Sequence, residues 1–403
     1  MVLSFTCGMI AARCKKTAEA LIKSITVEVS DKNCFLTLLG FISECRGDDS
    51  NFHLKMARLS GSFLKLSILD FYMELREADV VLLAEALKEN STLADLCLDH
   101  NDIDDQGATV LAEALKVNSA LTELRLDSAS IGRQGAASLT EALKVNSTLT
   151  KLRLSRNSRI LREGDTGLPE ALKVNSTLKE LRFNSNSLLD AIGFAEALKV
   201  NSTLTGLHLD DNGIGDQGAT DLAEALKVNT TLTELRLDCN GIGHQGAIGL
   251  AEALEVNSSL KVLHLDHNRI DSQGATGLAE ALKVNSSLTV LHLDHNRIDD
   301  QGATGLAEAL KVNSSLTVLY LDQNGIGDQG ATGLADALKV NSTLTKLFLQ
   351  KNGIGDQGAT GLIEALNMNS TLRLLYLRSN NFGEILFSEL RRLEHDGGII
   401  KLW

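Results

Sequence analysis

A short segment that could bind a metal ion occurs twice in the sequence. The fragment LHLDHNRID spans Leu263–Asp271 and recurs at Leu291–Asp299, so each copy brings two histidines and one aspartate close together. Imidazole nitrogens and carboxylate oxygens are common zinc ligands. The alternative is that these residues belong to a repeated scaffold, and the spacing of the two copies decides how they should be interpreted.

The two copies lie 28 residues apart and belong to a tandem repeat, because residues 258–285 and 286–313 differ at only two positions. The pattern Leu-x-x-Leu-x-Leu begins at residues 93, 121, 149, 178, 204, 232, 260, 288, 316, 344 and 372, with Phe183 as the last apolar residue of the fourth copy. In every copy except the second, where Ala129 stands, Asn follows three residues after the last apolar position. A fixed period of this length indicates a repeat protein.

One repeat predicts one strand and one helix. Leu291–Leu293 alternates apolar and polar residues, as a half-buried strand does. Within 303–310 the apolar residues recur at i, i+3, i+4 and i+7, which places them on one face of a helix. Asp299 and Asp300 are N-cap candidates, and we expect Asn313 to end the helix in the left-handed conformation.

Stacked copies of this unit must form a curved α/β solenoid. Parallel strands lie about 4.8 Å apart, whereas packed helix axes need about 8 to 10 Å. The stack therefore bends into a horseshoe, with parallel strands on the concave face and helices on the convex face. We expect the repeated Asn residues to form a ladder that satisfies buried backbone groups.

The pattern LxxLxLxxN at a 28-residue period, followed by GAxxLAEAL, resembles the ribonuclease-inhibitor class of leucine-rich repeats. That class includes the repeat domains of NOD-like receptors and the Ran GTPase-activating protein. The resemblance extends from about Leu64 to Trp403. For function it implies a protein-binding surface whose partners vary, because one fold hosts many functions.

The repeats define the expected domain organisation. We expect an N-terminal capping region at 1–62, formed by a degenerate repeat or, alternatively, by a separate module. We expect repeats at 63–380 and a C-terminal cap at 381–403. That cap would contain a helix at Glu384–Glu394, a last strand in IIKLW, and Trp403 over the final core layer. The third repeat is 29 residues long and arginine-rich, with Pro169 starting a late helix, and the fourth is 26 residues long. This irregular region is either a second docking site or decay of the repeat.

Composition and cysteine usage bear on partners and compartment. The formal net charge of −13 argues against a nucleic-acid partner, because a protein that binds nucleic acid would carry a stripe of basic residues. No apolar run reaches the roughly 18 residues needed to span a bilayer. The apolar start MVLSFTCGMIAA lacks a basic region before it, and the six cysteines show no framework spacing. We therefore expect a cytoplasmic monomer without a cofactor or membrane contact.

A candidate partner-binding column runs down the concave face. It consists of the residues between the last two leucines of each repeat, which point away from the core. From the second repeat onward the column comprises Arg125, Arg153, Arg182, His208, Arg236, His264, His292, Tyr320, Phe348 and Tyr376. A mostly acidic column, which includes Asp266 and Asp294, lies two residues further along each strand. Because His264 and His292 should be about 5 Å apart across neighbouring strands, four potential metal ligands meet there.

We nevertheless predict a protein contact and no metal, because tandem copying explains the cluster and each His can pair with an adjacent Asp. The arginines are expected to pair with neighbouring acids such as Glu123, Glu180 and Glu234. Tyr320, Phe348 and Tyr376, as an exposed aromatic trio, are residue types enriched at interface hot spots. His267 and His295 are expected at a solvated rim.

The sequence contains no pattern typical of an enzyme. It has no nucleophile elbow and no HExxH, and its acidic residues recur once per repeat. We therefore expect a non-enzymatic scaffold that binds a partner protein on its concave face. The alternative is a GTPase-activating protein for a small Ran-like GTPase, but that family has more irregular repeats and usually an acidic tail.

Overall fold

The computed structural model describes residues 77–157, 167–187 and 191–383, with Ile68–Phe71, Ile400–Lys401 and a few isolated residues. It divides into two compact units, Met1–Ser187 and Leu188–Trp403. The division falls in the repeat that is two residues short. The predicted helix at Glu384–Glu394, the placement of Trp403 and nearly all of the 1–62 region lie outside the described residues, so the expected domain boundaries stay predictions.

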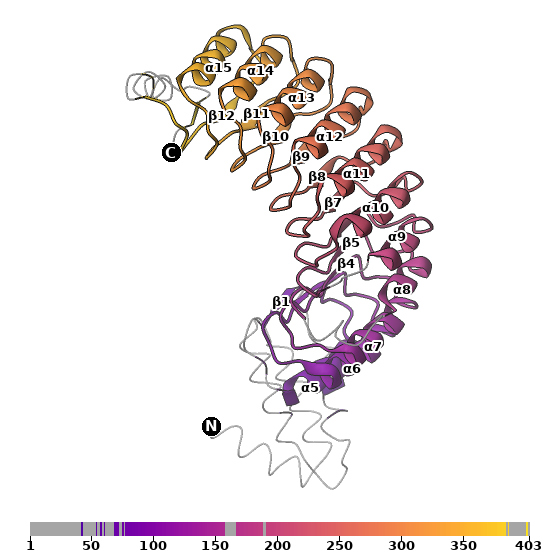
Figure 1. The fold of residues 1–403 in the computed structure, drawn as a ribbon. Coiled ribbons are helices and arrows are strands. Elements are labelled where there is room, and N and C mark those ends of the chain that lie inside the picture. The colour runs from indigo at the N-terminus through magenta and orange to yellow at the C-terminus, as the bar shows by residue number, and fades with distance from the viewer. Residues whose placement is uncertain are drawn as a thin grey trace, which may run out of the picture. The chain divides into compact units, whose positions relative to one another are not determined.

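In the first unit, short parallel strands alternate with helices (Figure 1). The strands pair in sequence order, from β1 to β5. They are β1 (Ile68–Asp70), β2 (Asp95–Cys97), β3 (Glu123–Arg125), β4 (Lys151–Arg153) and β5 (Glu180–Arg182). The helices are α5 (Glu77–Glu89), α6 (Asp104–Leu115), α7 (Arg133–Leu143) and α8 (Leu168–Val174).

The second unit continues the same alternation, and its strands also pair in parallel and in sequence order. The strands are β6 (Gly206–His208), β7 (Glu234–Arg236), β8 (Val262–His264), β9 (Val290–His292), β10 (Val318–Tyr320), β11 (Lys346–Phe348), β12 (Leu374–Tyr376) and β13 (Ile400–Lys401). The helices are α9 (Ile192–Leu198), α10 (Gly215–Leu226), α11 (His244–Val256), α12 (Ser272–Val284), α13 (Asp300–Leu310), α14 (Asp328–Leu338) and α15 (Asp356–Met368).

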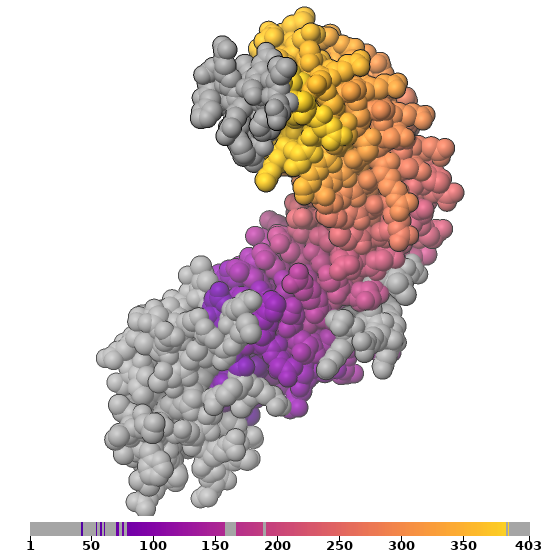
Figure 2. Space-filling view, turned by 60° about the vertical axis from the view of Figure 1, so that its left-hand side comes forward, coloured from indigo at the N-terminus to yellow at the C-terminus, as the bar shows by residue number. Residues whose placement is uncertain are grey.

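Within the second unit, strands line the inner side of an arc and helices its outer side (Figure 1), with successive repeats layered in order (Figure 2). This arrangement confirms the predicted α/β repeat solenoid. Strand β13 confirms the predicted last strand of the C-terminal region. Among the described residues, no helix is both long and apolar enough to cross a bilayer.

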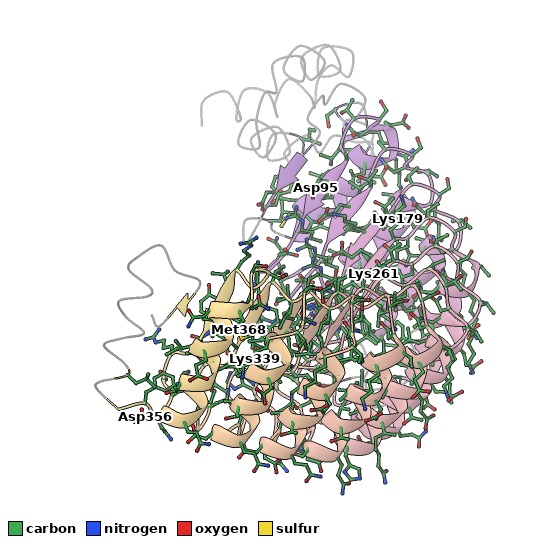
Figure 3. All side chains as sticks on the ribbon, turned by 90° about the horizontal axis from the view of Figure 1, so that it is seen from above. Asp95, Lys179, Lys261, Lys339, Asp356 and Met368 are labelled. Carbon is green, nitrogen blue, oxygen red and sulfur yellow. The ribbon has the colours of Figure 1, made fainter. Side chains whose placement is uncertain are left out.

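A single core runs between the strand layer and the helix layer of each unit. In the repeat of β9, the side chains of Leu288, Leu291, Leu293 and Ile298 are fully buried. Small residues let successive helices approach closely: a Cβ added at Gly302 would lie 2.8 Å from Ile298 Cγ2 and 3.1 Å from the Cα of the preceding helix's first residue. Figure 3 shows one outer helix, α15, between its labelled ends, Asp356 and Met368.

The Asn that recurs after each strand forms the predicted ladder of side-chain amides. Asn268 Nδ2 donates to the Leu237 carbonyl at 2.9 Å and to the Leu265 carbonyl at 3.1 Å. Its Oδ1 accepts the backbone N–H groups of Asn240 and Ile242, each at 3.0 Å. One side chain therefore satisfies buried backbone groups in two successive repeats and fixes the loop that leaves the strand.

A second Asn row ends the helices, and the prediction for it was wrong. Asn313 does not adopt the left-handed conformation. Instead its Nδ2 donates to the carbonyls of Leu282 and Asn285, at 2.7 and 3.1 Å, and its Oδ1 accepts the N–H of Ser315 and Leu316. The side chain therefore satisfies an orphan carbonyl at the end of the preceding helix, α12, and two N–H groups of the turn that follows α13. Asn313 is only 6% exposed.

Two aspartates begin α13 and α14 in different ways. As predicted, Asp299 is the N-cap of α13, accepting the N–H of Gln301 and Gly302. Asp300 instead serves the next repeat, because its Oδ1 accepts the N–H of Gly327 and Gly330 at 2.8 and 2.7 Å. Pro169 lies in the first turn of α8, which confirms the predicted late start of that helix.

Candidate functional site on the inner strand face

The inner face of the second unit carries a continuous stack of rings. The third residues of β8 to β12 are paired in register, and their side chains lie opposite the buried leucines. We call His264, His292, Tyr320, Phe348 and Tyr376 the ring column. Neighbouring ring centroids lie 3.8, 4.0, 4.1 and 4.6 Å apart, and the planes are within 17° of parallel. Strand spacing of about 4.8 Å matches the separation at which aromatic rings stack, so identical register produces the column.

Stacking changes what the ring column presents to solvent. Tyr320, Phe348 and Tyr376 are half-buried, and His264 is only 9% exposed. The prediction of an exposed aromatic trio was therefore wrong in degree, because each ring covers the faces of its neighbours. The stack therefore leaves ring edges, and not ring faces, open to solvent.

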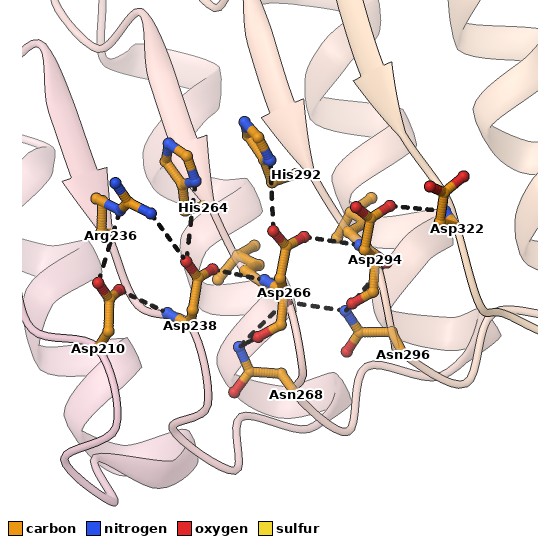
Figure 4. Close-up of polar contacts among 12 residues, drawn as sticks. Asp210, Arg236, Asp238, His264, Asp266, Asn268, His292, Asp294, Asn296 and Asp322 are labelled. Atoms are coloured by element: carbon orange, nitrogen blue, oxygen red, sulfur yellow. Dashed lines mark hydrogen bonds and ion pairs between the residues drawn. The ribbon is translucent and has the colours of Figure 1, made fainter. Parts of the chain in front are cut away.

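An acidic ladder runs beside the ring column, two residues further along each strand (Figure 4). Each Oδ1 accepts the backbone N–H of the next aspartate: Asp238 to Asp266 at 2.7 Å, Asp266 to Asp294 at 2.7 Å, and Asp294 to Asp322 at 2.6 Å. Asp210 begins this ladder, accepting the Asp238 N–H at 3.1 Å. The carboxylates thus replace part of the backbone pairing where the strands diverge into loops.

Burial beside like charges makes these carboxyl groups unusual. Burial, and then repulsion from Asp210 and Asp266, raises the pKa of Asp238 to about 7. Burial together with the charges of Asp266 and Asp322 raises the pKa of Asp294 to about 8. Burial likewise lowers the pKa of His264 to about 3, with the neighbouring His292 adding to the effect, so this imidazole is neutral. At neutral pH the inner face therefore carries less negative charge than its aspartates suggest.

His264, Asp266 and His292 bring three possible metal-ligand atoms within 4.8 Å of one another. However, a metal ion bound by an imidazole nitrogen lies in the plane of that ring, and these two rings are stacked, 17° from parallel. Their lone pairs cannot converge on one ion unless a ring rotates. Each histidine faces an aspartate of the preceding repeat: His292 Nδ1 lies 3.3 Å from Asp266 Oδ2, and His264 Nδ1 lies 3.9 Å from Asp238 Oδ2. This geometry favours histidine–aspartate pairs, and the absence of a metal stays a prediction.

The arginines of the first unit are paired with acids, as the sequence indicated. Arg125 contacts Glu123 at 2.9 Å and Asp95 at 2.6 Å. Arg153 lies 3.3 Å from Glu123, and Arg182 lies 2.6 Å from Glu180. The register places Arg153 between Arg125 and Arg182. Each is partly exposed, so they form a patch in which positive charge is largely compensated.

In the second unit the predicted acid partner of Arg236 was wrong. The Arg236 guanidinium lies 3.6 Å from both Asp210 and Asp238, so it belongs to the acidic ladder. Glu234 instead lies 3.3 Å from Nε2 of His208, which is 3% exposed. The sequence could not distinguish these partners, because Glu234 and Asp238 each lie two positions from Arg236 and Asp210 lies in the preceding repeat.

A rim column was not recognised as a unit from the sequence. The residues directly before the ladder asparagines all have positive φ, among them His267, His295, Gln323, Lys351 and Ser379. His267 and His295 stack with centroids 3.7 Å apart, and His267 is exposed. Their common position one residue before each Asn was the available signal, since a left-handed residue there turns its side chain to the rim.

Of the comparisons with known proteins, the one with family models supports the repeat assignment. A leucine-rich repeat family model matches residues 89–112, 200–223, 228–251, 256–279, 284–307, 312–335 and 340–362. A comparison with curated proteins finds no match. Among solved structures, the chain is similar to an internalin from Listeria monocytogenes, with 18% identity, a TM-score of 0.48, and coverage of 82% of this chain and 84% of that one. It is also similar to actin-binding site 2 of leiomodin-1, with 25% identity, a TM-score of 0.32, and coverage of 43% and 94%.

The matched segments coincide with the strand–helix units of the structure. Residues 284–307, for example, include β9 and most of α13. The buried leucines and the ladder asparagines recur at the 28-residue spacing of the matched segments from residue 200 onward. The fold is therefore that of a leucine-rich repeat solenoid.

Proposed function

We propose that this protein is an interaction scaffold that binds a partner protein on its concave strand face. The partner-binding residues are Arg125, Arg153, Arg182, His208, Arg236, His264, His292, Tyr320, Phe348 and Tyr376. The repeat fold supports a protein-interaction role in general. The inner face as the contact surface, the ribonuclease-inhibitor-like class, the monomeric state and a cytoplasmic location are parts of the proposal.

The ring column is the observation that carries this proposal. Histidine, tyrosine and phenylalanine occupy one position of successive repeats, whereas the core needs no ring there because Leu291 and Leu319 already fill it. Tyrosine combines a large apolar ring with a hydroxyl and costs little side-chain entropy when it is immobilised. Rings held by their neighbours are pre-ordered, which lowers the entropic cost of binding.

The arginine patch of the first unit is a separate, weaker contact surface. Its guanidinium groups are already paired, and exposed ion pairs contribute about 1 kcal/mol or less. A partner that contacts Arg125 or Arg153 would therefore gain orientation and selectivity more than affinity. For this reason the test concentrates on the ring column.

The test compares partner capture by the native protein and by a variant with alanine at His264, His292, Tyr320, Phe348 and Tyr376. Proteins retained from a native lysate are quantified by mass spectrometry. We expect at least one protein to be depleted about tenfold or more with the variant, as loss of two or more hot-spot contacts predicts.

A matched control variant carries alanine at the exposed apolar residues near the helix ends of the same unit. These residues, each between 63% and 68% exposed, are Val256, Val284, Val312, Val340 and Met368. The control should retain the partner. Because ring stacking also stabilises the fold, the milder Phe348→Ala/Tyr376→Ala variant and thermal unfolding accompany the test. Identical retention by all variants would contradict the proposal.

A further inference from the structure

A polar hollow lies at the C-terminal end of the described inner face. The role that we infer for it rests on the proposed function. Its volume is ≈ 290 Å³. It is lined by two rows of three residues, one from the continuation of the acidic ladder and one from the rim column. The lining residues are Asp322, Gln350, Arg378, Gln323, Lys351 and Ser379.

The sign of charge changes along this hollow. The ladder position is Asp in successive repeats up to Asp322, then becomes Gln350 and finally Arg378. Both oxygens of Asp322 are occupied by Gln350, whose backbone N–H donates at 2.6 Å and whose Nε2 donates at 2.8 Å. Asp322 therefore orients Gln350 and makes no ion pair with either cation, although its charge interacts with that of Lys351.

Two cations of the hollow have no ion-pair partner among the described residues. Lys351 and Arg378 are both exposed, and neither has a carboxylate within ion-pair distance in the part of the chain that the structure describes. Elsewhere on the described surface, helix lysines such as Lys283 and Lys311 lie 2.6 Å from a glutamate three residues away. An ammonium group, a guanidinium group and the Ser379 hydroxyl thus remain as donors at one concave site.

We infer that this hollow binds an acidic side chain of the partner protein, with Lys351 and Arg378 as the anchoring residues. A carboxylate is the group that an arginine fork and a lysine ammonium recognise through charge-assisted hydrogen bonds. Phe348 and Tyr376 precede Gln350 and Arg378 by two residues on the same strands, so apolar ring edges adjoin the donors. A glutamate or aspartate beside an apolar residue of the partner fits both parts.

The test measures binding of a short fluorescein-labelled glutamate peptide to the full chain by fluorescence anisotropy at low ionic strength. The net charge of −13 repels such a peptide in general, so binding requires a local cationic site. The Lys351→Gln/Arg378→Gln variant should bind about tenfold more weakly or worse, as loss of charge-assisted contacts predicts.

The matched control is Lys346→Gln/Arg373→Gln, which makes the same charge change in the same two repeats. These exposed residues precede Phe348 and Tyr376 in the sequence, whereas Lys351 and Arg378 follow them. This control should bind the peptide within about twofold of the native protein, as expected of distant exposed charges. The single variant Lys351→Gln should bind the peptide more weakly while its unfolding midpoint is unchanged, which excludes a folding effect.

Two results overturn the inference: no peptide binding by the native protein, or equal loss in the pocket variant and the control. Neither result contradicts the proposed function, because that is tested separately through the ring column. Conversely, peptide binding that depends on Lys351 and Arg378 would stand even if the ring-column variant retained every partner.

Discussion

Asp294 shows at residue scale how the repeat creates chemistry that no isolated residue has. Its carboxyl group lies between Asp266 and Asp322, and its Oδ1 is fixed by the Asp322 N–H at 2.6 Å. Burial and these like charges hold its pKa at about 8. An aspartate with a raised pKa binds its proton more tightly in the folded than in the unfolded chain. Stability from this group is therefore full below the unfolded pKa of about 4 and falls as the pH rises to about 8.

The variant Asp294→Asn should remove this pH dependence. Asparagine keeps the acceptor for the Asp322 N–H but cannot be deprotonated. We expect the variant to be more stable than the native protein at pH 8 and above, by on the order of 1 kcal/mol after allowance for solvent screening, and similar to it near pH 4. Urea unfolding at several pH values measures the difference. Asp336→Asn, at an exposed helix carboxylate, is the control, and equal pH profiles for Asp294→Asn and the native protein would refute the account.

The residues also show the limit of sequence reasoning. The strand position of the ring column followed directly from the repeat, because period-2 alternation places residues such as His292 and Tyr320 opposite buried leucines. Three features did not follow: the mutual covering of the rings, the pairing of Arg236 with Asp210 and Asp238, and the lack of an ion pair to Lys351 or Arg378 within the described ranges. Each depends on side-chain distances between repeats, and the spacing gives only the register.

At the scale of elements, strand–loop transitions are held by side-chain amides in place of regular backbone pairing. Asn296 Nδ2 donates to the carbonyls of Leu265 and Leu293, at 2.9 and 3.2 Å, and its Oδ1 accepts the Ile270 N–H at 3.0 Å. The ladder was predictable because Asn recurs at one position. The cap of α14 by Asp300 was not, because its acceptor serves N–H groups 27 and 30 residues away.

Replacing Asn296 with alanine should therefore destabilise more than one repeat. The change leaves buried backbone groups of two neighbouring repeats without partners, which costs about 2 to 3 kcal/mol. Urea unfolding gives the total effect, and hydrogen exchange should show faster exchange at Ile270. Arg297→Ala, at the adjacent exposed residue, should change the unfolding free energy by less than about 0.5 kcal/mol. If Asn296→Ala lowers the free energy of unfolding no more than Arg297→Ala does, the Asn ladder is dispensable for stability.

At the scale of the whole molecule, each unit is a stack in which a repeat contacts mainly its neighbours. Stability in such arrays is a sum of repeat and interface contributions, so the inner surface can vary while the core repeats. The sequence uses this freedom: the core leucines recur in all eleven copies with Phe183 as the single replacement, whereas the inner position changes between arginine, histidine, tyrosine and phenylalanine. The fold could be predicted from the period. The choice of partner could not, because it depends on the few positions that do not repeat.

The most direct measurement of the central claim is site-specific photo-crosslinking on the native fold. A benzoylphenylalanine replaces Phe348 in the ring column or, as control, Val312, which is 63% exposed near the end of α13. After irradiation in a native lysate, crosslinked proteins are identified by mass spectrometry. The account predicts a distinct crosslinked protein from position 348 that is absent from position 312. Crosslinks from position 312 alone, the same products from both, or none from position 348 would contradict it.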